Sequence, residues 1–228
     1  MRHFVIGVLL ALAVALPLTF VAPPTVPAEG DCRTIEDFAH AQIGEFPSDW
    51  KARKETGKSV YSVQEEGGKR FLRAVSRKVG IQAAREVQSW DLTTYPILAW
   101  SWRPREFPKG ADERDERRND SVLAVYMLVP HSRVAGPKAV KYIWSEKVPV
   151  GTRLTSNSNL TQVHVLRSGA PASPDAWTQE RVNVLTEWKA AFKESDTPKQ
   201  VGIAVLTDAD DTKSSAAGDY ADFRACRG

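Results

Sequence analysis

Short strand-like segments dominate this 228-residue chain, and they constrain its fold more than any other feature of the sequence. Ten segments are rich in β-branched and aromatic residues, and turn residues separate them. They span residues 59–66, 70–76, 81–90, 97–103, 121–130, 139–146, 161–169, 177–185, 200–208 and 219–225, and residues 34–38 add a further candidate. Many alternate between apolar and polar residues, which predicts strands with one buried and one wet face.

Only one segment has good helical periodicity. Leu185, Trp188, Ala191 and Phe192 recur at helical spacing within residues 185–195. One helix cannot cover the faces of a many-stranded parallel sheet, so repeated βαβ units are excluded. We therefore expect an all-β fold, an antiparallel β-sandwich with one short helix, and we expect every strand pair to be antiparallel.

The first 28 residues have the layout of a secretory signal. Arg2 precedes an apolar run from Phe4 to Leu16, and a Pro-rich exit ends in small residues at Ala28. The apolar run is shorter than the roughly 20 residues that a membrane-spanning helix needs. We expect a signal peptide at residues 1–28, a single domain at 29–228, no membrane span in the mature chain, and a periplasmic or secreted location.

Charge excludes one class of partner. The mature chain carries 30 basic and 28 acidic residues, interspersed along the sequence. A nucleic-acid-binding domain is expected to concentrate basic residues in a patch or stripe. We therefore predict no nucleic-acid partner, and we expect the protein to be a monomer.

The two cysteines lie at the two ends of the mature chain, Cys32 and Cys226. In an exported protein a pair of cysteines indicates a disulfide. This disulfide would close nearly the whole domain into one loop and would require the first and last strands to lie side by side. The alternative is two unpaired thiols at frayed ends.

Several stretches together resemble a known family. They are "EDFAHAQIGEFPSDW", "YPILAWSWRPREFPKGADERDERRNDSVLAVYML", "VKYIWSE" and "GIAVLTDADDTKSSAAGDYADF". In their order and spacing they resemble the bacterial family called domain of unknown function 3047. The resemblance implies an exported jelly-roll sandwich of the galactose-binding kind, in which the first and last strands are neighbours. It implies no activity.

An acidic stretch follows the strand predicted at 200–208. Asp208, Asp210, Thr212 and Asp219 fall at positions one, three, five and twelve of the calcium-loop pattern. Position six is Lys213, where the pattern needs Gly, so an EF-hand is excluded. Structural calcium on these four residues is one interpretation. The other is a polar turn in which Asp208 and Asp210 accept backbone N–H groups.

Aromatic and polar residues on the central strands form the candidate ligand-binding set. In "PILAWSWR", Leu98, Trp100 and Trp102 share one face, and Arg103 lies on the other. Burial favours the core for Trp100, while Trp102 lies nearer the strand end. The candidate ligand-binding residues are Trp102, Arg103, Asp120, Tyr126, Tyr142 and Trp144. The alternative is an ordinary wet sheet face with tyrosines at its rim.

Motifs for catalysis are absent from the sequence. It has no G-x-S-x-G elbow, phosphate-binding Gly loop, H-E-x-x-H helix or C-x-x-C pair. We therefore expect a non-catalytic module that binds a glycan or a cell-envelope component. One alternative is a polysaccharide-acting enzyme that uses Asp120 with the Asp208 to Asp211 cluster, or Tyr126 with Arg103. Another is a structural envelope protein that binds another protein.

Overall fold

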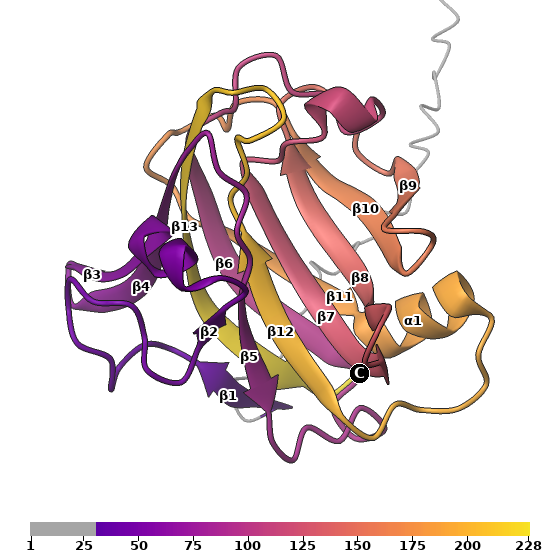
Figure 1. Cartoon of the computed structure of the whole chain (residues 1–228). Helices are drawn as coiled ribbons and strands as arrows, with labels where there is room; N and C mark the ends of the chain where they lie inside the picture. Colours follow the sequence, from indigo (N-terminus) through magenta and orange to yellow (C-terminus); the bar gives the residue numbers. More distant parts are fainter. Residues whose placement is uncertain (1–30) are drawn as a thin grey trace, which may run out of the picture.

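The computed structural model describes residues 31–228 and shows two β-sheets packed face to face (Figure 1). The predicted signal peptide lies outside the described residues. The β-sandwich predicted from the strand pattern is confirmed, and its sheets are antiparallel except for one strand pair. Among the described residues, no helix is long and apolar enough to span a membrane.

The first sheet, which we call sheet A, has the strand order β11-β6-β13-β4-β3, and β1 pairs with the second half of β13. Its strands are β1 (Cys32–Glu36), β3 (Tyr61–Glu66), β4 (Lys69–Arg77), β6 (Ile97–Glu106), β11 (Thr178–Asn183) and β13 (Ser215–Cys226). Two 3₁₀ turns, η2 (Glu55–Val60) and η3 (Glu116–Arg118), lie in the connections.

The second sheet, sheet B, has the order β2-β5-β12-β7-β8-β10-β9. Its strands are β2 (Lys51–Ala52), β5 (Ala83–Val87), β7 (Leu123–Ser132), β8 (Gly136–Ser145), β9 (Arg153–Ser156), β10 (Thr161–Ser168) and β12 (Val201–Leu206). In Figure 1, sheet B lies in front of sheet A.

One strand pair differs from the expectation. β8 and β10 run parallel, with Ala139 opposite Thr161 and Ser145 opposite Ser168. Parallel neighbours need a long return connection. Residues 146–160 supply it, and β9 within that connection pairs antiparallel with β10 at the edge of sheet B. The expectation that every pair is antiparallel is therefore wrong for this one pair.

Aromatic side chains fill the space between the sheets. Trp100 and Trp102 of β6 share one face, as the alternation along this strand predicts, and both point inward and are at most 1% exposed. Tyr142 and Trp144 of β8 meet them from sheet B, with ring centroids 5.7 Å apart for Trp100–Tyr142 and 5.8 Å for Trp102–Trp144. Each buried tryptophan contributes about 5 kcal/mol as an upper figure.

The helix α1 (Val184–Phe192) lies where the periodicity of the sequence predicts it. It begins at Asn183, whose side chain accepts a hydrogen bond from the N–H of Thr186 at 2.9 Å. Trp188 on its apolar side is 1% exposed and belongs to the core. The helix therefore closes one end of the sandwich beside β6 and β8.

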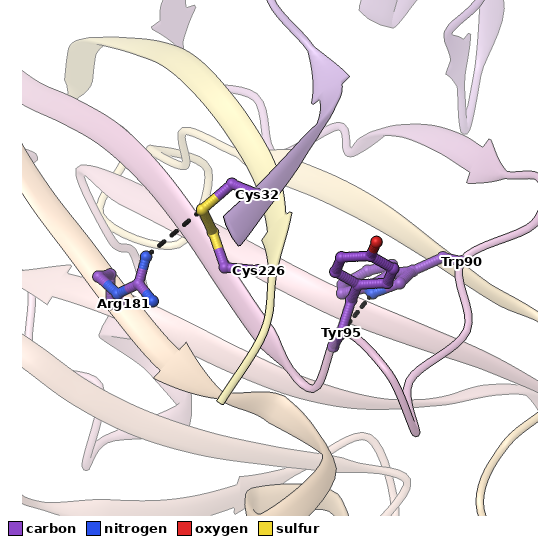
Figure 2. Close-up of a disulfide and its surroundings, with 5 residues drawn as sticks. All are labelled: Cys32, Trp90, Tyr95, Arg181 and Cys226. Atoms are coloured by element: carbon purple, nitrogen blue, oxygen red, sulfur yellow. Dashed lines mark hydrogen bonds between the residues drawn. A yellow bond between two sulfur atoms is a disulfide. The ribbon is translucent and has the colours of Figure 1, made fainter. Parts of the chain in front are cut away.

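β13 is the strand on which sheet A is built. Its first half pairs with β4 and its second half with β1, while β6 runs along its other side. Cys32 lies directly opposite Cys226 in the β1–β13 register, and the two form a disulfide with their Cα atoms 4.0 Å apart (Figure 2). The predicted disulfide and the adjacent terminal strands are confirmed.

We expect the Cys32→Ser/Cys226→Ser double variant to lower the free energy of unfolding by roughly 2–5 kcal/mol, because the disulfide constrains almost the whole unfolded chain. At about 2–4 °C per kcal/mol this is a clear fall in the thermal midpoint. Differential scanning calorimetry checks it. Reductant should lower the midpoint of the native protein and leave that of the double variant unchanged; equal midpoints for both proteins under oxidising conditions would contradict the prediction.

Candidate functional site

The outer face of sheet B carries a row of residues that crosses the strands. In the strand register Lys51 lies opposite Ala84, Ala84 opposite Ala204, Ala204 opposite Tyr126, and Tyr126 opposite Lys141. Because side chains alternate along each strand, all five belong to the face turned away from the core. Ala84 and Ala204 are small, so they leave a shallow depression between Lys51 on one side and Tyr126 and Lys141 on the other.

A cavity of about 710 Å³ lies over this row, and we call it the groove. Its apolar surface comes from Ala84, Tyr126, Leu128, Ala139 and Leu206. Polar side chains also line it: Lys51, Arg53, Gln82, Asn119, Lys141, Asn157, Thr161, Asp208 and Asp211.

A second cavity, of about 580 Å³, continues the groove along the same face. The two share Lys51, Ala84, Leu128 and Pro137, so they adjoin. The second cavity adds His131 near the end of β7 and Arg133 from the turn between β7 and β8. Together the two cavities form an extended depression on the outer face of sheet B, and we use the word groove for both from here on. It has an apolar floor and hydrogen-bonding groups along it.

The long charged segment between β6 and β7 covers the far end of this face. Glu113 in this segment is 7% exposed and accepts hydrogen bonds from the hydroxyl groups of Ser121 and Ser145, at 3.0 and 2.5 Å. Ala124 and Ile143 point outward from sheet B and are nevertheless fully buried, together with Val148. The segment and the connection between β8 and β9, which contains Val148, therefore close this end of the face together.

Three titratable groups face one another in the groove. Burial raises the pKa of the Asp208 carboxyl group to about 9; the close approach of Asp210 and the charge of Asp120 add to this, and Lys141 opposes it. Burial also raises the pKa of Tyr126, against the influence of Lys141. Burial by itself lowers the pKa of Lys141, but the ionised forms of Tyr126, Asp208 and Glu113 outweigh it and raise that pKa. The Lys141 Nζ lies 5.7 Å from the centre of the Tyr126 ring.

The structure divides the candidate ligand-binding residues between three places. Trp102, Tyr142 and Trp144 lie in the core and are at most 3% exposed. Tyr126 alone lies in the groove. Tyr126 and Tyr142 lie on opposite faces of sheet B, because Tyr126 is paired with Lys141, one residue before Tyr142, and successive residues point to opposite faces.

Arg103 and Asp120 complete that set. Arg103 points outward from sheet A, is 2% exposed, and stacks on Trp177 at 4.4 Å from the ring centre. It is therefore separated from Tyr126 by the whole sandwich, and the two cannot act together as a base and a positive charge. Asp120 is fully buried beside the groove, where its carboxylate accepts hydrogen bonds from the chain that follows β12.

Three of the acidic residues meet at one place. Carboxylate oxygens of Asp120, Asp208 and Asp210 all lie within 4.8 Å of one another, and we call these residues the acidic cluster. Of the predicted metal set, it contains Asp208 and Asp210. Thr212 is bound to it indirectly, since its hydroxyl donates to Asp120 at 2.5 Å. Asp120 takes the place that the sequence pattern assigned to Asp219.

Asp219 lies on the outer face of sheet A instead. In the strand register it is directly opposite Arg73 on β4 and Arg103 on β6. Its carboxylate accepts hydrogen bonds from Arg73, Arg103 and Arg105 at 2.7 to 3.0 Å, and it is fully buried. Burial opposes ionisation, but these three guanidinium groups outweigh it and lower the pKa of Asp219. Asp219 therefore belongs to an arginine cluster and to no metal site.

Sequence reasoning missed Lys51, Ala84 and Lys141, which lie with Tyr126 in one row of the groove. A signal for them existed in the alternation of the strands, which places Tyr126 and Lys141 each one residue away from a core position. No aromatic ladder marks this face, because most of the aromatic residues are in the core.

Comparison with known proteins assigns the family. The model of the family described as "Protein of unknown function (DUF3047)" matches residues 48–224, and the chain belongs to this family. The resemblance found in the sequence is confirmed. No curated protein matches the chain.

Among solved structures the chain is similar to carbohydrate-binding modules and to several enzymes. TmCBM61 in complex with β-1,4-galactotriose is 12% identical, with a TM-score of 0.42; the match covers 86% of this chain and 99% of that one. The family 11 carbohydrate-binding module of Lic26A-Cel5E of Clostridium thermocellum is 6% identical, with a TM-score of 0.41 and coverage of 86% and 95%. The family GH12 endoglucanase 3 of Trichoderma harzianum is 10% identical, with a TM-score of 0.36 and coverage of 87% and 98%.

We expect Asp219→Asn to lower the free energy of unfolding by about 3–5 kcal/mol at neutral pH, because the buried Arg103 loses its buried carboxylate partner and keeps only the exposed Glu66. Chemical denaturation checks this. The pKa of Asp219 is lowered in the folded state, so its contribution is complete above the unfolded pKa of about 3.9 and is lost as pH falls through the lower folded value. The difference between the variant and the native protein should therefore shrink in acid; a constant difference down to about pH 2 would refute this account.

Proposed function

We propose that this protein binds a glycan in the groove on the outer face of sheet B and does not catalyse a reaction on it. The composition of the groove is the main support for this proposal. Its floor combines alanine, leucine and the ring of Tyr126, and its sides present amide, hydroxyl, ammonium and guanidinium groups. Sugars need both kinds of surface, because their C–H faces pack on apolar groups while their hydroxyl groups hydrogen-bond to polar side chains.

The shape of the groove favours a chain of sugars over a single small molecule. Two adjoining cavities, of about 710 and 580 Å³, extend across sheet B from Asn157 and Thr161 to Arg133 and Gln200. A typical small-molecule pocket encloses its ligand within one cavity of about 300–1,000 Å³. An extended groove instead accommodates successive residues of a polysaccharide or of an envelope glycan.

We propose a location outside the cytoplasm for this activity. The disulfide between Cys32 and Cys226 supports it, because such bonds persist in oxidising compartments such as the periplasm or the extracellular space. A protein in the periplasm or the extracellular space would meet polysaccharides of the cell envelope or of the medium.

A groove-filling variant tests the proposal. Ala84 is shared by both cavities and points out of β5, so Ala84→Trp should fill the groove without entering the core. We expect it to reduce retention by a binding glycan at least about tenfold, measured by affinity electrophoresis against neutral and uronate-containing polysaccharides.

Val75→Trp is the matched control, because Val75 is 39% exposed on the outer face of sheet A. Both variants should keep the native thermal midpoint within a few degrees. Equal retention of the Ala84 and Val75 variants, or no retention of the native protein by any glycan, would contradict binding in the groove. New reducing ends or unsaturated sugars in the retained polysaccharide would contradict the non-catalytic part and favour the enzyme.

A further inference from the structure

The acidic cluster is built from two chain segments that the fold holds against each other. Asp120 lies shortly before β7, which begins at Leu123, and Asp208 and Asp210 follow β12. The N–H of Asp208 donates to the carbonyl of Ser121 at 3.0 Å, and the N–H of Ala209 donates to the carbonyl of Val79 at 3.2 Å. These backbone bonds fix the cluster beside a third segment, residues 78–80, so the three carboxylates do not meet by chance on a mobile surface.

Asp120 is the partnered member of the cluster. Its Oδ1 accepts the N–H of Asp211 at 3.1 Å, and its Oδ2 accepts the N–H and the hydroxyl of Thr212 at 2.7 and 2.5 Å. Each carboxylate oxygen still has a second lone pair, so Asp120 keeps the capacity to bind a cation.

Asp208 is the unpartnered member. It is only 9% exposed, and within residues 31–228 its Oδ1 has no hydrogen-bond partner. A buried polar atom without a partner costs about 1–3 kcal/mol, and more for a charged group. No hydrogen bond or ion pair joins Asp208 to Lys141 in that part of the chain, although the ammonium group is close enough to lower the pKa of Asp208. A bound cation, or a proton shared with Asp210, would satisfy this oxygen.

Gly80 keeps the space in front of that oxygen open. A Cβ atom on residue 80 would lie 2.2 Å from the Asp208 Oδ1 and 2.4 Å from the Asp210 Oδ1. Any other residue would therefore push into the two oxygens. The φ of Gly80 is not in the left-handed region, so the backbone conformation does not require glycine here. Glycine at this position therefore leaves space beside the carboxylates of Asp208 and Asp210.

We propose that Asp120, Asp208 and Asp210 bind a calcium ion. Three carboxylates that converge around one buried, unpartnered oxygen form an anionic cage, and a divalent cation offsets their mutual repulsion. The donors are all oxygens, which suits a hard cation and disfavours zinc or copper. Calcium fits better than magnesium, because it accepts irregular geometry and bidentate carboxylates, whereas magnesium demands a near-ideal octahedron.

The ion would link the loop after β12 to the start of β7 at the edge of the groove, since Asp208 and Gly80 also line the groove. It would thereby hold one side of the proposed glycan site. Binding of the ion does not depend on a glycan, so the two proposals are tested separately.

Isothermal titration of the EDTA-treated, dialysed mature protein with calcium chloride alone tests the site. We expect one calcium per chain, with a dissociation constant on the order of 10⁻⁵–10⁻³ M, a rise of several degrees in the thermal midpoint, and weaker binding of magnesium chloride. No heat of binding together with an unchanged midpoint would overturn the proposal. A proton shared between Asp208 and Asp210 would then explain how the two carboxylates lie so close together.

Variants that remain folded without calcium separate a loss of calcium binding from a loss of stability. Asp210→Asn should lower the calcium affinity at least about tenfold while leaving the midpoint of the metal-free protein unchanged or raised, because it removes a like charge next to Asp208. Gly80→Ala should also abolish the calcium response by filling the space. Asp211→Asn is the matched control, because Asp211 is an exposed neighbour outside the cluster. Equal loss of calcium binding in the Asp210 and Asp211 variants would refute the assignment.

Discussion

The packing of tryptophan and tyrosine rings between the two sheets is the interaction on which the rest of this structure depends. Trp100 and Trp102 from sheet A meet Tyr142 and Trp144 from sheet B, and all four are nearly inaccessible to water. Burial of that much aromatic surface stabilises the sandwich strongly, but it also removes these side chains from any contact with a ligand. Binding therefore has to use the outer faces of the sheets.

The two outer faces are used differently. On sheet A, Asp219 is held by three arginines, and Trp177 stacks on Arg103, so the polar groups in the middle of this face satisfy one another. On sheet B, the outward residues are small in the middle of the row, and Lys141, Tyr126 and Asp208 face a cavity. A face whose charges are already neutralised by its own side chains offers little to a ligand, whereas the groove presents groups that are not fully paired with one another.

The groove and the acidic cluster share a structural cause. The loop after β12 leaves sheet B next to the start of β7, because β12 and β7 are antiparallel neighbours. This arrangement puts Asp208 at once into the wall of the groove and against Asp120. A cation at the cluster and a glycan in the groove are therefore physically linked through Asp208, although each is proposed on separate contacts.

Local pattern was enough to determine the fold class, the helix, the core position of Trp100 and the pairing of Cys32 with Cys226. Alternation along a strand is a property of consecutive residues, and a chain with two cysteines has one possible intrachain pair. Tertiary structure alone decided which strands are neighbours and in which register. That choice placed Tyr126 and Tyr142 on opposite faces, joined Asp120 to Asp208 and Asp210, and sent Asp219 to the arginines, because a shift of one residue in strand pairing turns every side chain to the other face.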